Sequence, residues 1–167
     1  MNQILKNSGF TLIELIIVVA IIALLASAGF VAINPGKRSG DANNAKRWAD
    51  VTAIADAYSA YLVDNGGTHP TTTPTPTAGV TYSITTTTNA SGNLSICDGG
   101  ANATTTSQYI DLEALVSNGY IGKIPLDPAY GAGDSRNTGY YFYRESSGTL
   151  IIGSCDSYNN DDIELVR

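Results

Sequence analysis

The residues of this chain that could do chemistry are few and mostly scattered. Its 167 residues include 15 acidic side chains, 9 basic side chains, two cysteines and a single histidine, His69. His69 lies in a stretch rich in Pro and Thr, with no acid or nucleophile at a spacing typical of a catalytic site. The sequence has no Gly-x-Ser-x-Gly elbow and no phosphate-binding glycine loop. We therefore expect a protein that is not an enzyme.

Acidic residues crowd together near the C-terminus, at Asp156, Asp161 and Asp162. Carboxylate oxygens at close spacing suit Ca²⁺, so these three residues are candidate calcium ligands. Their spacing departs from that of an EF-hand loop, and a polar turn before the last strand explains the same residues. Calcium is the one cofactor that the sequence suggests, and a plain turn without a metal is the alternative.

The two cysteines, Cys97 and Cys155, allow one internal disulfide. They show no Cys-x-x-Cys or Cys/His spacing, which argues against a structural zinc site. We predict a bridge formed in an oxidising compartment, which contributes about 2–4 kcal/mol to stability. Two unpaired thiols are the alternative.

The charge balance argues against a nucleic-acid-binding face. The formal net charge is −6, and phosphate contacts need clustered Lys and Arg. Tyr140, Tyr141 and Tyr143 could stack on bases of a single strand, but aromatic residues are also ordinary strand residues. We therefore do not expect direct nucleic-acid binding.

An uncharged apolar segment dominates the N-terminal part of the chain. Charged residues make up only 14% of the sequence, against about 25% in an ordinary soluble domain. No charge occurs between Leu15 and Gly36. As a helix this run would rise about 33 Å, enough to cross a hydrocarbon core of about 30 Å. A signal peptide cut after Ala28 is disfavoured because the apolar run continues past that site, and a plain membrane anchor leaves Glu14 unexplained. A cut before the apolar run explains the short leader and this acid.

The residues around that cut resemble the N-terminal signal of type IV prepilins and type II secretion pseudopilins. The leader ends in KNSG at residues 6–9, and FTLIE follows at residues 10–14. The resemblance implies that prepilin peptidase cleaves between Gly9 and Phe10 on the cytoplasmic side and methylates the Phe10 amine. It also implies a partner set of further copies of the chain, an assembly platform protein and an ATPase.

Glu14 is a candidate assembly residue. A carboxylate in an apolar helix is costly, and cleavage after Gly9 creates a cation at the Phe10 amine. A close opposite pair recovers much of the penalty on an isolated charge, so Glu14 of one subunit can pair with Phe10 of a neighbour. This pairing would fix the axial register of a filament. The alternative is a Glu14 that reaches the lipid headgroups and does nothing more.

The pattern divides the chain into four parts. We predict a leader at 1–9, a transmembrane and polymerisation helix at 10–36, an amphipathic second half of the helix at 37–67, and a globular head at 68–167. The pattern predicts an interruption at 34–36 and a helix end at 65–67, because Pro and Gly stand there. One apolar stripe with helical spacing in the second half comprises Trp48, Val51, Ala55, Tyr58 and Leu62.

We predict that the head begins with an extended Thr- and Pro-rich loop at 68–79, followed by short strands and a short helix. Its predicted strands are 80–85, 94–97, 140–144, 149–152 and 163–166. A short helix is predicted at 111–116 and a hairpin turn at 146–148. The stretch at 119–128, GYIGKIPLDP, resembles the head of the major pseudopilin and related pilins. We therefore predict an α+β, pilin-like fold in which a long N-terminal helix packs on a small antiparallel sheet.

These observations predict a structural subunit of a type IV pilus-like filament. A type II secretion pseudopilin is the alternative within the family, and a membrane-anchored surface binding protein that never polymerises is the alternative outside it. We expect a single pass through the cytoplasmic membrane, in contact with its lipids and with the head outside. Assembly would then place the chain in an extracellular or envelope-spanning filament.

Overall fold

The computed structural model describes residues 9–70, 75–86, 95–96, 104–105, 109–129 and 137–167, in two compact units, Met1–Ser39 and Gly40–Arg167. The elements in chain order are α1 (Leu12–Ile33), α2 (Pro35–Asp64), β1 (Thr81–Thr85), β2 (Ser95–Ile96), β3 (Thr104–Thr105), β4 (Tyr109–Asp111), α3 (Glu113–Ser117), β5 (Tyr140–Arg144), β6 (Leu150–Ser154), the 3₁₀ helix η1 (Tyr158–Asn160) and β7 (Glu164–Val166).

The predicted interruption of the long helix is confirmed at Asn34. This residue ends α1 with φ 45°, in the left-handed region, and α2 begins at the next residue, Pro35. Proline suits the first position of a helix because its missing N–H would have no partner there. The Asn34 side chain accepts a hydrogen bond from the backbone N–H of Lys37 at 3.3 Å, which satisfies a donor in the first turn of α2.

The predicted end of α2 is also confirmed. Gly66 and Gly67 have φ angles of 61° and 84°, which residues with a side chain rarely adopt. The Gly67 N–H donates to the Leu62 carbonyl at 2.8 Å, which closes the last turn of the helix.

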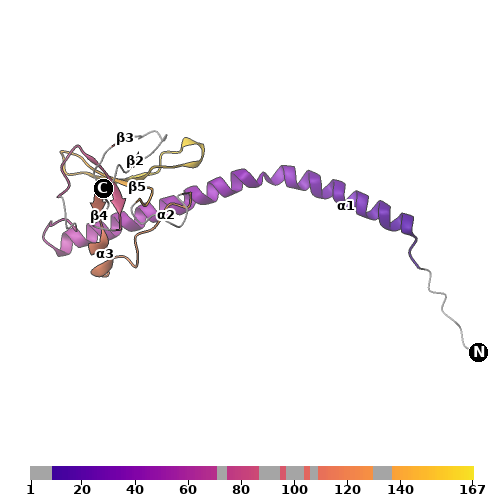
Figure 1. Ribbon diagram of the computed structural model, residues 1–167, viewed down its shortest axis with the longest axis horizontal. Helices are drawn as coiled ribbons and strands as arrows, with labels where there is room; N and C mark the ends of the chain where they lie inside the picture. Colours follow the sequence, from indigo (N-terminus) through magenta and orange to yellow (C-terminus); the bar gives the residue numbers. More distant parts are fainter. Residues whose placement is uncertain (1–8, 71–74, 87–94, 97–103, 106–108, 130–136) are drawn as a thin grey trace, which may run out of the picture. The chain divides into compact units, whose positions relative to one another are not determined.

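The core of the second unit lies between one face of α2 and the sheet, as Figure 1 shows with the strands and α3 gathered beside α2. Val51, Ile54 and Tyr58 on this face are fully buried. The prediction for Trp48 was wrong, because its side chain is 42% exposed. The buried face passes instead through Arg47, one residue earlier in the chain, and a charged residue gave no hydrophobic signal.

The five-stranded sheet has the order β4-β1-β5-β6-β7. β5 pairs antiparallel with β1 and β6, and β6 pairs antiparallel with β7. The prediction of an antiparallel sheet needs correction, because β4 lies parallel to β1, with Ile84 opposite Ile110. The long connection between β1 and β4 permits this, since parallel neighbours need a crossover of about a dozen residues or more. The fold is therefore α+β with a mixed sheet.

The strand and hairpin predictions are confirmed at most positions in the second half of the chain. β5 has the predicted bounds, and Glu145 N–H donates to the Thr149 carbonyl at 2.8 Å across the hairpin turn. β6 extends to Ser154, beyond the predicted end. The short helix begins later than predicted, because Asp111 ends β4 and its side chain accepts a hydrogen bond from Glu113 N–H at 2.9 Å.

Candidate functional site

The N-terminal segment holds the residues predicted for processing and assembly. Gly9 and Phe10 precede the first helical turn, and the Phe10 side chain is 86% exposed. Thr11 caps α1, and Glu14 lies in the first turn. The bond predicted to be cleaved, between Gly9 and Phe10, therefore lies in non-helical, exposed backbone just before the helix.

Glu14 and Thr11 form a reciprocal cap at the start of α1. A Glu14 carboxylate oxygen accepts a hydrogen bond from Thr11 N–H at 3.0 Å and another from the Thr11 hydroxyl at 2.8 Å. The Glu14 N–H donates in turn to the Thr11 hydroxyl oxygen at 3.3 Å. This is the capping-box arrangement, in which two unsatisfied backbone donors of a helix start find side-chain partners. The assembly role predicted for Glu14 from the sequence did not include this capping role.

The surface of α1 after Glu14 is exposed and apolar. The stretch Leu12–Phe30 is long and apolar enough to cross a membrane, and none of it is buried within the structure. The exposed side chains of α1 include Ile13, Leu15, Ile16, Leu24 and Phe30. Such a surface requires lipid or other apolar helices around it, so the N-terminal segment suits a membrane-anchored chain that later packs among like helices.

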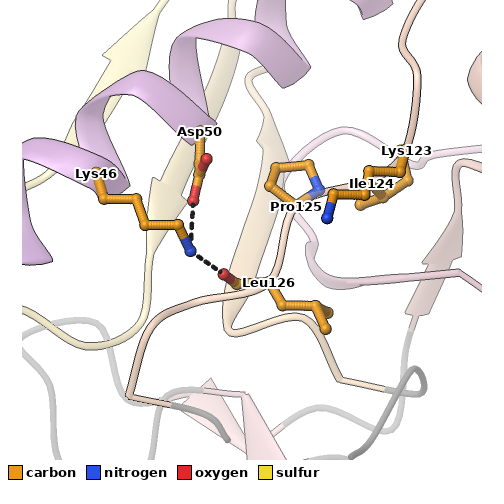
Figure 2. Close-up of a pocket in the computed structure, with 6 residues that line it drawn as sticks. All are labelled: Lys46, Asp50, Lys123, Ile124, Pro125 and Leu126. Atoms are coloured by element: carbon orange, nitrogen blue, oxygen red, sulfur yellow. Dashed lines mark hydrogen bonds and ion pairs between the residues drawn. The ribbon is translucent and has the colours of Figure 1, made fainter. Parts of the chain in front are cut away.

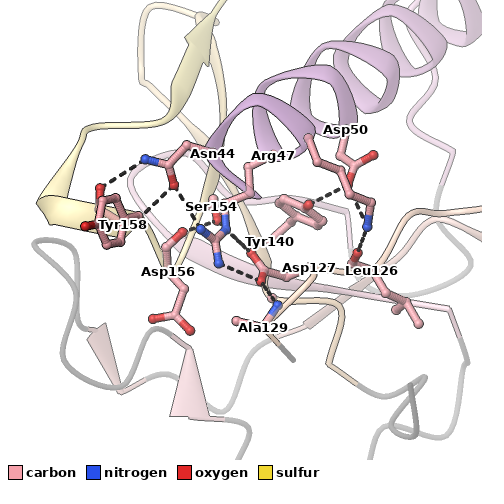
Figure 3. A network of polar contacts seen from close by, with 12 residues as sticks. Asn44, Arg47, Asp50, Leu126, Asp127, Ala129, Tyr140, Ser154, Asp156 and Tyr158 are labelled. Atoms are coloured by element: carbon pink, nitrogen blue, oxygen red, sulfur yellow. Dashed lines mark hydrogen bonds and ion pairs between the residues drawn. The ribbon is translucent and has the colours of Figure 1, made fainter. Parts of the chain in front are cut away.

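A buried ion pair joins α2 to the segment before β5, as Figure 3 shows. The Arg47 Nε donates to Asp127 at 2.6 Å and its Nη2 donates to the other carboxylate oxygen at 2.9 Å. Asp127 also accepts hydrogen bonds from the Ala129 N–H at 2.7 Å and the Ser154 hydroxyl at 3.1 Å. The hydrogen bonds from Arg47 to Asp127 raise the pKa of Arg47 above its ordinary value. A pair with this number of hydrogen bonds holds the loop at one position on α2.

Tyr140 of β5 and Asp50 of α2 make a second polar link between the same elements. The Tyr140 hydroxyl donates to the Asp50 carboxylate at 2.7 Å. Burial, followed by this hydrogen bond, raises the pKa of Tyr140 strongly, so the phenol stays neutral. Tyr140 and Tyr141 are both buried, and their rings are therefore structural parts of the sheet.

A pocket of about 210 Å³ lies beside this link, between α2 and the segment at 123–126 (Figure 2). Lys46 spans its edge, since its Nζ donates to the Leu126 carbonyl at 2.9 Å and lies 3.7 Å from the Asp50 carboxylate. The remaining lining comes from Lys123, Ile124 and Pro125. One wall of the pocket, residues 123–126, thus belongs to the stretch at 119–128 that resembles the head of the major pseudopilin.

The three predicted calcium ligands do not lie together as a metal site. Within the described residues, no group of three or more His, Cys, Asp or Glu side chains could hold a metal ion. Asp161 instead accepts a hydrogen bond from the Asn44 side-chain amide at 2.9 Å, while Asp162 is exposed. The Asp156 carbonyl accepts a hydrogen bond from the Ser154 hydroxyl at 2.7 Å. Calcium binding stays a prediction.

Asn44 fastens the C-terminal segment to α2. Its side-chain oxygen accepts a hydrogen bond from Tyr158 N–H at 2.8 Å, and its amide donates to the Tyr158 carbonyl at 3.0 Å. The Tyr158 ring lies directly over Gly40, where a Cβ atom would overlap it. Cys155 is buried just before this segment, whereas Cys97 lies outside the described residues, so the predicted disulfide stays a prediction.

Comparisons with known proteins agree with the N-terminal signal. The family model of the prokaryotic N-terminal methylation motif matches residues 4–30. The chain is 38% identical over 72 residues to type II secretion system core protein G of Vibrio cholerae, a match that covers 43% of this chain and 47% of that protein. The chain thus spans about half the length of the curated relative it matches. No solved structure matches the chain significantly.

Proposed function

We propose that this chain is a structural subunit of a helical filament. Its N-terminal methylation motif and its similarity to a type II secretion core protein support its assignment as a type IV pilin or pseudopilin. The observation that carries the proposal is the exposed apolar surface of α1 behind a single acid, Glu14, next to the cleavage signal. Helices of this kind leave the membrane only if other apolar helices replace the lipid. Contacts between unlike faces of successive copies do not close, and so they build a filament. This is a structural role, and the family is not one of enzymes.

Processing precedes assembly in this proposal. Prepilin peptidase cleaves between Gly9 and Phe10, and the new amine of Phe10 is methylated. The exposed, non-helical backbone at these two residues supports access by the peptidase. The chain then waits in the cytoplasmic membrane with its head outside, until a platform protein and an assembly ATPase supply the energy for extraction.

A pilus and a type II secretion pseudopilus are both consistent with these observations. The relative is a core protein of a type II secretion system, which supports the pseudopilus as the second candidate. Deletion of the gene separates the two: loss of sheared surface filaments indicates a pilin, whereas retention of exoproteins in the envelope indicates a pseudopilin. A chain that anchors a surface binding domain without polymerising would be found in neither assembly.

The assembly role of Glu14 can be separated from its capping role. Gln at position 14 keeps an oxygen that can accept from Thr11 N–H but removes the charge. Thr11→Ala removes the capping hydroxyl, at a cost of about 1 kcal/mol, and keeps the charge. We expect Glu14→Gln, as the only copy in the native host, to be cleaved and inserted normally and to form no filaments.

Thr11→Ala is the matched control and is expected to assemble, because the pairing with the Phe10 amine of a neighbour needs only the carboxylate. Glu14→Ala, which lacks both cap and charge, should behave like Glu14→Gln. Wild-type filament yield from Glu14→Gln, or equal losses in Glu14→Gln and Thr11→Ala, would reject the charge-pairing role.

A further inference from the structure

His69 lies just beyond the C-terminal end of α2, where its ring bridges two elements of the second unit. The Tyr58 hydroxyl of α2 lies 2.5 Å from Nδ1, and the Arg144 Nη1 of β5 lies 3.2 Å from Nε2. The His69 side chain is half-buried, and the next residue, Pro70, is buried. Both ring nitrogens thus have a partner, one on a helix and one on a strand.

These two contacts determine which nitrogen carries the proton. A guanidinium group can only donate hydrogen bonds, so Nε2 must present its lone pair to Arg144. A neutral imidazole then carries its proton on Nδ1, which donates to the Tyr58 oxygen. A second proton on Nε2 would face the N–H of Arg144 and place two positive charges in contact.

We propose that His69 is an acid-sensitive attachment that fastens the segment after α2 to Tyr58 and Arg144 when the imidazole is neutral and releases it when Nε2 takes up a proton from solvent. The step is a simple protonation, with no other reactant. It does not depend on whether the chain forms filaments.

Among the residues that the structure describes, the charged and titratable groups in contact with His69 are the Arg144 guanidinium on β5 and the Tyr58 phenol on α2. Burial and then the charge of Arg144 lower the pKa of His69 below its ordinary value. Burial raises the pKa of Tyr58, so its phenol stays neutral at all relevant pH values. Because the folded pKa of His69 is lowered, the attachment is fully present above about pH 6.5 and weakens as the pH falls toward the folded pKa.

The other end of the segment is held by contacts that involve no imidazole and no carboxylate. Gly79 N–H donates to the Arg144 carbonyl at 2.8 Å, and Thr77 N–H donates to the Tyr82 hydroxyl at 2.9 Å. Acid therefore frees the end at residues 68–70 and leaves the end at residues 77–79 attached to the sheet.

The experiment uses the full chain in detergent micelles and follows the imidazole carbon-bound protons by NMR, which needs no assignment because His69 is the only histidine. We expect a titration midpoint below 6.5 and a higher midpoint in Arg144→Gln, since that variant removes the facing charge. Arg167→Gln is the matched control: it removes another half-exposed arginine of the head, which pairs with Asp56, and should leave the midpoint unchanged. A midpoint at or above 6.5, or the same midpoint in the Arg144 variant, would overturn the proposal.

Hydrogen exchange, corrected for the intrinsic pH dependence of amide exchange, measures the release itself. Exchange at Thr68 and His69 should rise as the pH falls, by up to about tenfold for each pH unit between about 6.5 and the folded pKa, and then level off. Residues 77–79 should show no such rise. His69→Gln should give pH-independent exchange at residues 68 and 69, and a rise that persists in this variant would assign the effect to another group.

Discussion

Arg47 and Asp127 face each other across 80 positions of sequence and form a two-pronged ion pair, with side chains that are 4% and 0% exposed. A charge removed from water in this way is strongly destabilising when its partner is absent. Arg47 stands on the same face of α2 as Val51, Ile54 and Tyr58, so the pair sits at the edge of the apolar core. The pair fixes where the loop that carries Asp127 meets the helix.

We predict that Arg47→Met lowers the free energy of unfolding by about 3–5 kcal/mol, because it leaves the Asp127 carboxylate buried without its countercharge. Urea unfolding of the full chain in detergent, followed by Trp48 fluorescence, measures this change. Lys46→Met is the matched control: Lys46 is exposed and 3.7 Å from Asp50, and its loss should cost less than about 1 kcal/mol. The double variant Arg47→Met/Asp127→Leu should recover much of the loss, and equal effects of the Arg47 and Lys46 variants would contradict the prediction.

The close approach of Tyr158 to Gly40 makes a second prediction. Gly40→Ala should destabilise the second unit by about 1–3 kcal/mol, because the new methyl group would overlap the Tyr158 ring. Gly36→Ala is the control on the same helix: its new Cβ meets no atom nearer than 3.9 Å, and it should stabilise the helix by about 0.5–1 kcal/mol. The same urea experiment compares them. A Gly40→Ala chain as stable as wild type would show that Tyr158 does not pack there.

The disulfide prediction concerns Cys97 and Cys155. Free-thiol labelling of the denatured, unreduced protein should find no reactive cysteine, and reduction should lower the free energy of unfolding by about 2–4 kcal/mol. Reduced and denatured protein is the positive control for labelling. Two labelled thiols without reduction would show that the bridge is absent.

The calcium prediction is tested by chelation. If Asp156, Asp161 and Asp162 bind Ca²⁺, excess EGTA should lower the melting temperature of the full chain, and added Ca²⁺ should restore it. Asp162→Asn should remove the effect, because it takes away one of the three candidate ligands. Asp162 is exposed, so we expect the substitution itself to leave the core packing unchanged. An unchanged melting temperature would leave the hydrogen bonds of Asn44 as the means by which this turn is held.

The sequence predicted those features of the fold that local chemistry determines. Pro35 and the pair Gly66 and Gly67 mark the ends of α2 because each has a backbone preference of its own. The run of aromatic residues at 140–143 identified β5, where Tyr140 and Phe142 face the core. Features that depend on partners far along the chain were missed: the parallel pairing of β4 with β1 is one example.

The same contrast between local signals and distant partners holds for the functional and polar residues. Gly9, Phe10 and Glu14 could be predicted as site residues because they belong to one short signal, and their roles stay predictions. The position of Trp48 was wrong because apolar spacing alone assigned it to the core. Arg47 occupies the buried position because its charge is paired with Asp127. The periodicity of apolar residues cannot reveal an ion pair between residues 80 positions apart. A buried arginine could have been suspected only from its position, four residues before Val51 on the same helical face.

The mass of the N-terminal peptide of the chain, isolated from the membranes of the native host, tests the central claim most directly. A subunit processed for filament assembly must begin at Phe10 and carry one methyl group on its amine, because the Glu14 carboxylate needs that new terminus as its partner. We predict a peptide that starts with N-methylated Phe10. A peptide that starts at Met1, or after Ala28, would contradict the account.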